Sequence, residues 1–300
     1  MTRHLLDLDD LSPSELTRIL DLADDPSRPP LLAGQTVGLY FEKPSLRTRH
    51  SCETAVVHLG GHPVTFRSDE IGGSGRESMT DITRVLSGYH AILGARVFDH
   101  RVLEEMTACS QIPIVNLLSD RAHPCQALAD LLTMRQEWGS LAGATMAWIG
   151  DFNNVARSLA LGAAMAGMHF RIASPVGFGP SPADIDRLIL AGASGPPFMS
   201  DRPVEAAAGA DAVHTDVWSS MGQEDEIAAR RAAFEGFQVD TAVMAAATAK
   251  AVFMHCLPAH RGEEVATVVV DGPQSRVIVQ AHNRLHAFRG LLRFLLEGTV

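Results

Sequence analysis

The chain has 300 residues, and its 25 Lys and Arg against 35 Asp and Glu give a formal net charge of −10. This length suits two domains of about 150 residues each, and an acidic chain without a basic run argues against a nucleic-acid partner. No apolar run reaches about 18 residues and Met1–Asp10 lacks a signal-peptide pattern, so we expect a cytoplasmic protein without a membrane span. Its four cysteines are scattered, which is typical of reduced cytosolic thiols.

The first predicted elements lead to a strand, a sharp turn and a helix. A capping box at Ser12–Glu15 predicts an amphipathic helix, and the apolar segment Thr36–Phe41 predicts a strand. Pro44 ends this strand because proline cannot extend a β-ladder, and Ser45 is a good N-cap for a helix that continues to Leu59.

The start of this second helix predicts an anion site. Unpaired backbone N–H groups and the positive end of the helix dipole gather there, and Ser45, Arg47 and Thr48 add two hydroxyls and a guanidinium. Arg47 and Arg49 are two positions apart and cannot face one small ligand, so we assign Arg47 to the ligand and Arg49 to a structural pair. For this motif alone, a capped helix with solvated arginines remains an alternative.

The rest of the first half alternates strands and helices. A polar, glycine-rich segment between Arg67 and Ser78 is either a flexible linker or a functional loop, and a helix with Met79, Ile82, Val85 and Leu86 follows. A strand at Ala91–Leu93 leads to Arg96, which on sequence alone is equally well a surface arginine. After a strand at Ile112–Asn116, His123 and Gln126 share one face at the start of a helix that ends near Trp138.

The second half repeats this alternation and predicts a second parallel sheet. A buried strand at Thr145–Asp151 precedes a helix capped by Asn153 and Asn154. Further strands are expected at His169–Ala173, Ala212–Thr215 and Ala251–Met254, with helices at Ala183–Ala191 and Val239–Ala249 and a last helix opening at Asn283–His286. The fold class is therefore α/β, with two doubly wound domains of parallel sheets. A dinucleotide site is not indicated because Gly-x-Gly-x-x-Gly is absent.

Four motifs in order resemble the carbamoyltransferase family, and the last two resemble its ornithine branch. They are Ser45–Arg49, His123–Gln126 followed by Leu128–Asp130, Asp216–Glu224 and His255–Gly262. The resemblance extends from about Leu31 to the last helix. It implies a carbamoyl phosphate-binding domain at 1–135 with the C-terminal helix 284–300, an ornithine-binding domain at 136–283, and crossing helices between them.

The resemblance also implies a reaction and a site. Carbamoyl phosphate would donate its carbamoyl group to the side-chain amine of L-ornithine, giving L-citrulline and phosphate, without a cofactor or metal. Carbamoyl phosphate would be bound by Ser45, Leu46, Arg47, Thr48, Arg96, His123, Gln126, Cys256, Leu257 and Arg284. Ornithine would be bound by Asn154, Asp216, Ser220 and Met221, and the catalytic residues would be Arg96, His123, Asp216 and Cys256. The family further implies a homotrimer or a multiple of it, arginine biosynthesis, and a loop with Glu70 that reaches the site, in some members from a neighbouring subunit.

Three departures keep other readings open. Leu46 stands where the ornithine branch usually has Thr, Glu70 stands where an uncharged polar residue is usual, and the loop before Asn154 is one residue shorter. Leu46 favours N-acetylornithine as the acceptor, whereas Asp216–Gly222 favours a free α-amino acid over N-acetylornithine or putrescine. A carbamoyltransferase-like regulatory protein without activity is the alternative from another class, and a nucleotide-linked oxidoreductase is a distant third.

Overall fold

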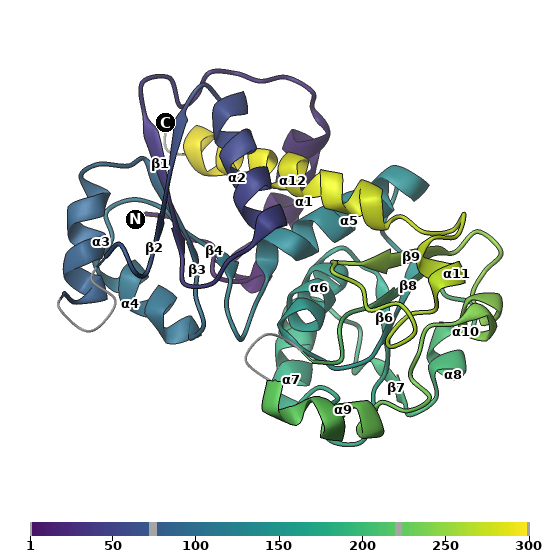
Figure 1. The fold of residues 1–300 in the computed structure, drawn as a ribbon. Coiled ribbons are helices and arrows are strands. Elements are labelled where there is room, and N and C mark those ends of the chain that lie inside the picture. Colours follow the sequence, from purple (N-terminus) through teal and green to yellow (C-terminus); the bar gives the residue numbers. More distant parts are fainter. Residues whose placement is uncertain (1, 72–76, 220–223, 299–300) are drawn as a thin grey trace. The chain divides into compact units, whose positions relative to one another are not determined.

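The computed structural model describes residues 2–71, 77–219 and 224–298. The chain separates into two compact units, Met1–Leu132 with His282–Val300 and Thr133–Ala281. Each unit contains one all-parallel sheet, which confirms the predicted α/β class (Figure 1). The boundaries between the units fall within the helices α5 and α12. Among the described residues, no helix combines the length and apolarity that crossing a bilayer requires.

The first unit is built on a four-stranded sheet of order β2-β1-β3-β4. Its strands are β1 (Thr36–Phe41), β2 (His62–Arg67), β3 (Ile92–Arg96) and β4 (Ile114–Leu118). Its helices are η1 (Leu8–Asp10), α1 (Pro13–Asp24), α2 (Leu46–His58), α3 (Met79–Ser87), α4 (His100–Cys109), the start of α5 (Pro124–Trp138) and most of α12 (Val277–Glu297). Helices α3 and α4 lie together on one side of the sheet and α2 lies on the other (Figure 1), as right-handed crossovers in this strand order require.

Most predicted elements of this unit are present. Strand β1 and the Ser45 cap are as predicted, while the β4 ladder begins at Ile114 instead of Ile112. The edge strand β2 (His62–Arg67) was not predicted from the sequence. It contains a proline and none of its residues is fully buried, so the ladder with β1 decides its conformation.

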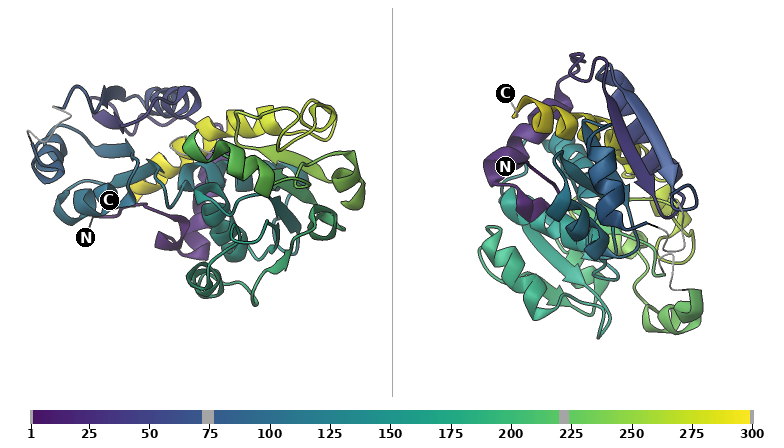
Figure 2. Two further views of the ribbon diagram at one scale, coloured as in Figure 1. Left: turned by 60° about the horizontal axis from the view of Figure 1, so that its bottom comes forward. Right: turned by 90° about the vertical axis from the view of Figure 1, so that its left-hand side faces the viewer.

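The C-terminal helix begins earlier than the sequence predicts. We expected it to open at Asn283, but α12 begins at Val277, so Arg284 lies two turns inside it. Its later part packs against α1, where a Cβ atom on Gly290 would lie 2.7 Å from the Ile19 carbonyl oxygen and the Ala23 nitrogen. Figure 2 shows this part of α12, in yellow, beside the purple N-terminal helix of the same unit.

The second unit has a five-stranded sheet of order β7-β6-β5-β8-β9. The strands are β5 (Thr145–Ile149), β6 (His169–Ala173), β7 (Phe198–Ser200), β8 (Ala212–Thr215) and β9 (Val252–His255). The helices are α6 (Asn154–Met165), α7 (Pro182–Leu190), α8 (Pro203–Ala207), η2 (Glu224–Glu226), α9 (Ile227–Ala233), α10 (Thr241–Ala246) and α11 (Thr267–Val270). Helices α6 and α7 cover one face, and α8 and α10 cover the other (Figure 1).

The sequence predicts the central strands of this unit better than its periphery. Strands β6 and β8 have the predicted bounds, and β9 is shifted by one residue. Strand β7 and the short helix α8 were not predicted, and α10 is shorter than the expected Val239–Ala249. A core of aliphatic and aromatic side chains around Phe234 and Phe253 fixes the face that α8 and α10 cover.

Candidate active site

The turn between β1 and α2 carries the residues that we predicted to bind an anion. The Ser45 hydroxyl accepts a hydrogen bond from the Thr48 backbone N–H, 3.4 Å away, and so caps α2. The amides of Leu46 and Arg47 occupy the first helical positions, where amides have no acceptor within a helix and the dipole is positive. Leu46 itself is 72% exposed and Arg47 is half-buried. This end of α2 therefore offers backbone donors and a guanidinium to an anion.

The Thr48 hydroxyl joins three of the predicted residues. Its oxygen accepts hydrogen bonds from Arg96 Nη1 at 3.3 Å and from Arg284 Nη2 at 3.2 Å. Arg284 also donates from Nη1 to Gln126 Oε1, 2.5 Å away, and Gln126 in turn donates to Asp130 Oδ1 at 2.7 Å. All of these side chains are buried. The structure thus brings together Thr48, Arg96, Gln126 and Arg284 from four separate elements.

His123 is neutral in this surrounding. It directly precedes α5 and its side chain is 4% exposed. Burial holds its pKa well below the usual value, and the positive charges of Arg284, Arg96 and Lys43 lower it further. The pKa of Lys43 is itself lowered by burial and by Arg96. A cluster of cations around a neutral histidine is suited to receive an anion, because the anion relieves their mutual repulsion.

Arg49 and Glu70 both make local contacts within the first unit. Arg49 Nε lies 2.8 Å from Glu53 Oε1, in the structural ion pair that we expected for it. Glu70 is exposed at the end of β2, and its carboxylate accepts a hydrogen bond from the Arg67 backbone N–H at 2.6 Å. Glu70 therefore closes a local turn, while residues 72–76 of the same loop lie outside the described residues.

In the second unit, a cluster forms where three neighbouring strands end. Asp216 follows β8, Cys256 follows β9, and Asn153 lies in the turn after β5. Cys256 Sγ donates to Asp216 Oδ1 at 3.0 Å, and Asn153 Nδ2 donates to Asp216 Oδ2 at 2.8 Å. Open parallel sheets bind ligands at this edge, outside the carboxyl ends of their strands. The cluster offers a buried carboxylate, which is suited to a cationic group.

Asn153 was missed as a site residue. Asn154, which we predicted to bind ornithine, is the first residue of α6, and its side-chain oxygen accepts from the Val155 backbone N–H, 3.1 Å away. Asn153 both caps α6 through Oδ1 and reaches Asp216 through Nδ2. The sequence signal was the Asn-Asn pair itself, in which either residue can serve as the cap. Ser220 and Met221 lie outside the described residues.

The turn after β9 carries the remaining predicted groups. Leu257 has a φ of 60°, in the left-handed region, and its backbone N–H donates to His255 Nδ1 at 2.9 Å. Ligand atoms of Asp216, His255 and Cys256 lie within 4.8 Å of one another. Both ring nitrogens of His255 already have hydrogen-bond partners, Leu257 and Glu264, so this set fits a metal ion poorly.

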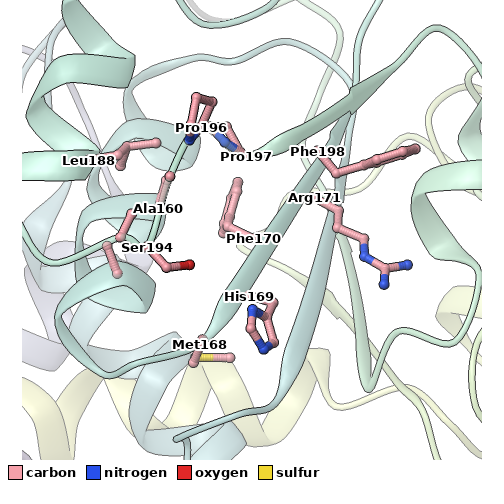
Figure 3. A pocket seen from close by; sticks show the side chains of 13 residues that line it. Ala160, Met168, His169, Phe170, Arg171, Leu188, Ser194, Pro196, Pro197 and Phe198 are labelled. Atoms are coloured by element: carbon pink, nitrogen blue, oxygen red, sulfur yellow. The ribbon is translucent and has the colours of Figure 1, made fainter.

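A pocket of about 210 Å³ lies elsewhere in the second unit. It is lined by residues of α6, β6, α7 and the segment 193–198, and Figure 3 shows Phe170 near Pro196 and Pro197 in its wall. None of the described site residues lines it, so we do not connect it with the predicted chemistry.

The fold and these residues define a class: a two-unit α/β protein with buried arginines beside a helix N-terminus in one unit and a carboxylate–amide–thiol cluster in the other. Residues 3–136 match the family model described as "Aspartate/ornithine carbamoyltransferase, carbamoyl-P binding domain". Residues 142–295 match "Aspartate/ornithine carbamoyltransferase, Asp/Orn binding domain". The chain belongs to the aspartate/ornithine carbamoyltransferase family.

Individual relatives are similar over the whole chain. The ornithine carbamoyltransferase of Acidothermus cellulolyticus is 48% identical, over 99% of this chain and 98% of the relative. The crystal structure of ornithine carbamoyltransferase from Thermus thermophilus superposes with a TM-score of 0.90 at 43% identity, over 99% of both chains. The crystal structure of anabolic ornithine carbamoyltransferase from Campylobacter jejuni gives 0.92 at 33% identity, over 100% of both chains.

Proposed function

We propose that this protein transfers the carbamoyl group of carbamoyl phosphate to the side-chain amine of L-ornithine. The observation that carries the proposal is the convergence of Arg96 and Arg284 on the Thr48 hydroxyl, beside the N-terminal amides of α2. This arrangement supplies several donors at one point, as a phosphate group and a developing oxyanion require. Full-length similarity to ornithine carbamoyltransferases supports the same reaction.

The residues of the first unit would bind carbamoyl phosphate. Ser45, the Leu46 amide, Arg47 and Thr48 would neutralise the phosphate, with Arg284 beside them. Arg96 and neutral His123 would donate to the carbonyl oxygen as it becomes negative. Gln126 would accept from the carbamoyl NH₂ group, together with the Cys256 and Leu257 carbonyls, because that group carries only donors. The first unit would thus correspond to the carbamoyl phosphate-binding domain.

The residues of the second unit would bind ornithine. Asp216 would pair with the α-ammonium group, and Asn153 holds that carboxylate from the other side. Asn154, Ser220 and Met221 would serve the α-carboxylate end of the substrate. Cys256 would orient and polarise groups near the attacking nitrogen, without forming a covalent intermediate. The second unit would then correspond to the ornithine-binding domain.

The reaction needs only proton loss and one displacement. The side-chain ammonium of ornithine, with a reference pKa near 10.4, first loses a proton to solvent. The neutral amine attacks the carbonyl carbon, a C–N bond forms, and the C–O bond to phosphate breaks as phosphate leaves with its electron pair. The second proton of the attacking nitrogen passes to the departing phosphate, which gives neutral citrulline and hydrogen phosphate. Positioning and preorganised donors account for catalysis in this scheme, and no resident cofactor is required.

The biological setting also belongs to the proposal. We infer a cytoplasmic enzyme of arginine biosynthesis, supported by the anabolic Campylobacter relative and by the acidic, cysteine-poor composition. By resemblance to the family, we infer a homotrimer or a multiple of it, with the segment from Glu70 to Glu77 near a subunit boundary.

Citrulline formation tests the proposal directly. The purified protein is incubated with carbamoyl phosphate and equal concentrations of ornithine, N-acetylornithine or putrescine. The carbamoylated acceptor and the released phosphate are quantified in each reaction. We expect ornithine to be the preferred acceptor, because putrescine would leave Asp216 and its neighbours without partners. Preference for N-acetylornithine or putrescine would show that ornithine is not the acceptor. Absence of turnover with all three would favour the alternative of a regulatory protein without activity.

A further inference from the structure

The turn that carries Cys256 and Leu257 has an unusual conformation. Leu257 is the one non-glycine residue with a positive φ in the described part of the chain. A side chain in the left-handed region is disfavoured, so such a residue persists only where its surroundings hold it. The backbone contact that holds it is the Leu257 N–H bond to His255 Nδ1, 2.9 Å long.

This contact fixes the protonation of the His255 ring. A backbone N–H is always a donor, so Nδ1 must accept, and the ring proton is on Nε2. Nε2 lies 3.2 Å from Glu264 Oε1, and both side chains have no exposed surface. His255 is therefore a neutral imidazole held between the Leu257 amide and the Glu264 carboxylate.

Glu264 connects both ends of the same loop. Its Oε1 also accepts from the His260 backbone N–H at 2.5 Å, so one buried oxygen binds the start and the far side of the turn. The His255 backbone N–H donates to Gln280 Oε1 at 2.9 Å, which ties the histidine to the start of α12 within the same unit. In the turn held by these contacts, the Cys256 thiol donates a hydrogen bond to Asp216 Oδ1.

We propose that the buried His255–Glu264 pair positions the Cys256–Leu257 turn for the carbamoyl group of the substrate. The inference rests on the proposed function, because it gives the turn's carbonyls the carbamoyl NH₂ as their ligand. His255 and Glu264 are positioning residues in this scheme: they touch the turn and not the reacting atoms. The hydrogen bond from Leu257 to His255 fixes the conformation of the turn, and the hydrogen bond from His255 to Glu264 fixes the orientation of the imidazole ring.

Two substitutions separate these contacts. In His255→Asn, the amide oxygen takes the place of Nδ1 and can still accept from Leu257, but the link to Glu264 is lost. In His255→Gln, the longer side chain can still donate to Glu264, but the acceptor for Leu257 is lost. We expect His255→Asn to lower the Tm while keeping most of the wild-type kcat. We expect His255→Gln to lower kcat roughly 10- to 100-fold and to raise the KM for carbamoyl phosphate, since misplaced groups cost about this much.

Glu264→Gln tests whether charge matters. Its amide oxygen can accept both hydrogen bonds without a charge, so a positioning role predicts nearly wild-type kcat and Tm. Glu264→Leu loses the link to the ring but keeps the Nδ1 acceptor for Leu257, so it should behave like His255→Asn. Equal kcat for the two His255 variants, or losses of kcat that follow Tm across all four variants, would overturn the proposal and reduce the pair to a structural role. A large loss in Glu264→Gln would also overturn it, in favour of a role for the charge.

A second measurement does not depend on turnover. The rate of iodoacetamide alkylation at Cys256, relative to Cys109 in the same protein, reports the thiol's position against Asp216. We expect this ratio to change in His255→Gln and to stay near wild type in His255→Asn. If the wild-type protein forms no citrulline, the proposed function is refuted, and the alkylation ratio still tests whether His255 holds the turn. Active wild-type protein with an unaltered His255→Gln variant would refute the turn inference alone.

Discussion

Arg284 Nη2 and Thr48 Oγ1 lie 3.2 Å apart, although 236 positions separate them in the sequence. The same hydroxyl oxygen accepts from Arg96 Nη1 at 3.3 Å. One small side chain thus aligns two buried guanidinium groups from two further elements of the first unit. Its hydroxyl is the point at which the helix start, the end of β3 and helix α12 meet.

Thr48→Val should therefore weaken the site while keeping its volume. The change removes one acceptor from each guanidinium, and hydrogen bonds to charged groups contribute about 1.5–3 kcal/mol each. We expect kcat/KM for carbamoyl phosphate to fall roughly 10- to 100-fold, measured by citrulline formation at saturating ornithine. Thr48→Ser retains the hydroxyl and is the matched control. Equal activity of the Val and Ser variants would contradict this role.

Arg47→Ala and Arg49→Ala should affect different properties. Arg47 lies at the anion site, and losing its guanidinium should weaken carbamoyl phosphate binding by about 1.5–3 kcal/mol, or roughly 10- to 100-fold. Arg49 makes an exposed pair with Glu53, which contributes about 0–1 kcal/mol to folding. Its removal should change the free energy of unfolding slightly and substrate binding not at all. Kinetics and urea unfolding of both variants check the assignment, and equal losses of binding would refute it.

Asn153 can be tested separately for its two contacts. Serine is also a good N-cap, so Asn153→Ser should keep α6 stable while it removes the amide that donates to Asp216. We expect the KM for ornithine to rise roughly tenfold with little change in unfolding free energy. Asn153→Ala should add a loss of about 1 kcal/mol in stability, since it also removes the cap. An unchanged KM for ornithine in Asn153→Ser would refute this role of Asn153.

The sequence predicts those parts of the site that depend on local geometry. The Ser45 cap, the start of α5 at His123 and the strand ends at Arg96 and Asp216 follow from capping residues and apolar runs. Their partners across the fold do not follow from pattern. The Arg284–Thr48 contact needs the packing of α12, which begins at Val277 after Arg276, and arginine is not a residue type that marks an N-cap.

Other differences have the same physical origin. Asn153 follows β5 and donates to Asp216 at the end of β8, a contact between two strand ends that no local pattern in the sequence indicates. The Glu264 partner of His255 sits nine positions away in a loop without periodicity, so a buried carboxylate there could not be foreseen. Strand β7 is three residues long, and the neighbouring β6 supplies the ladder that makes it a strand.

His123 should make the folding stability of the protein depend on pH. His123 has a pKa well below its usual value because burial, Arg284, Arg96 and Lys43 all disfavour its charged form. In the unfolded chain it regains a pKa near 6.5, so below about pH 6.5 the unfolded state binds a proton that the folded state does not. Folding stability should therefore fall as pH drops through this window, by up to about 1.4 kcal/mol per pH unit from this group.

The His123→Asn variant should lose the part of this pH dependence that His123 contributes. Urea unfolding of both proteins at fixed protein concentration between pH 5 and 8 measures it, and the two curves should run parallel above pH 7, where the histidine is neutral in both states. Parallel curves below pH 6.5 as well would show that folding does not change the protonation of His123, and would contradict its neutral, cation-facing role in the site.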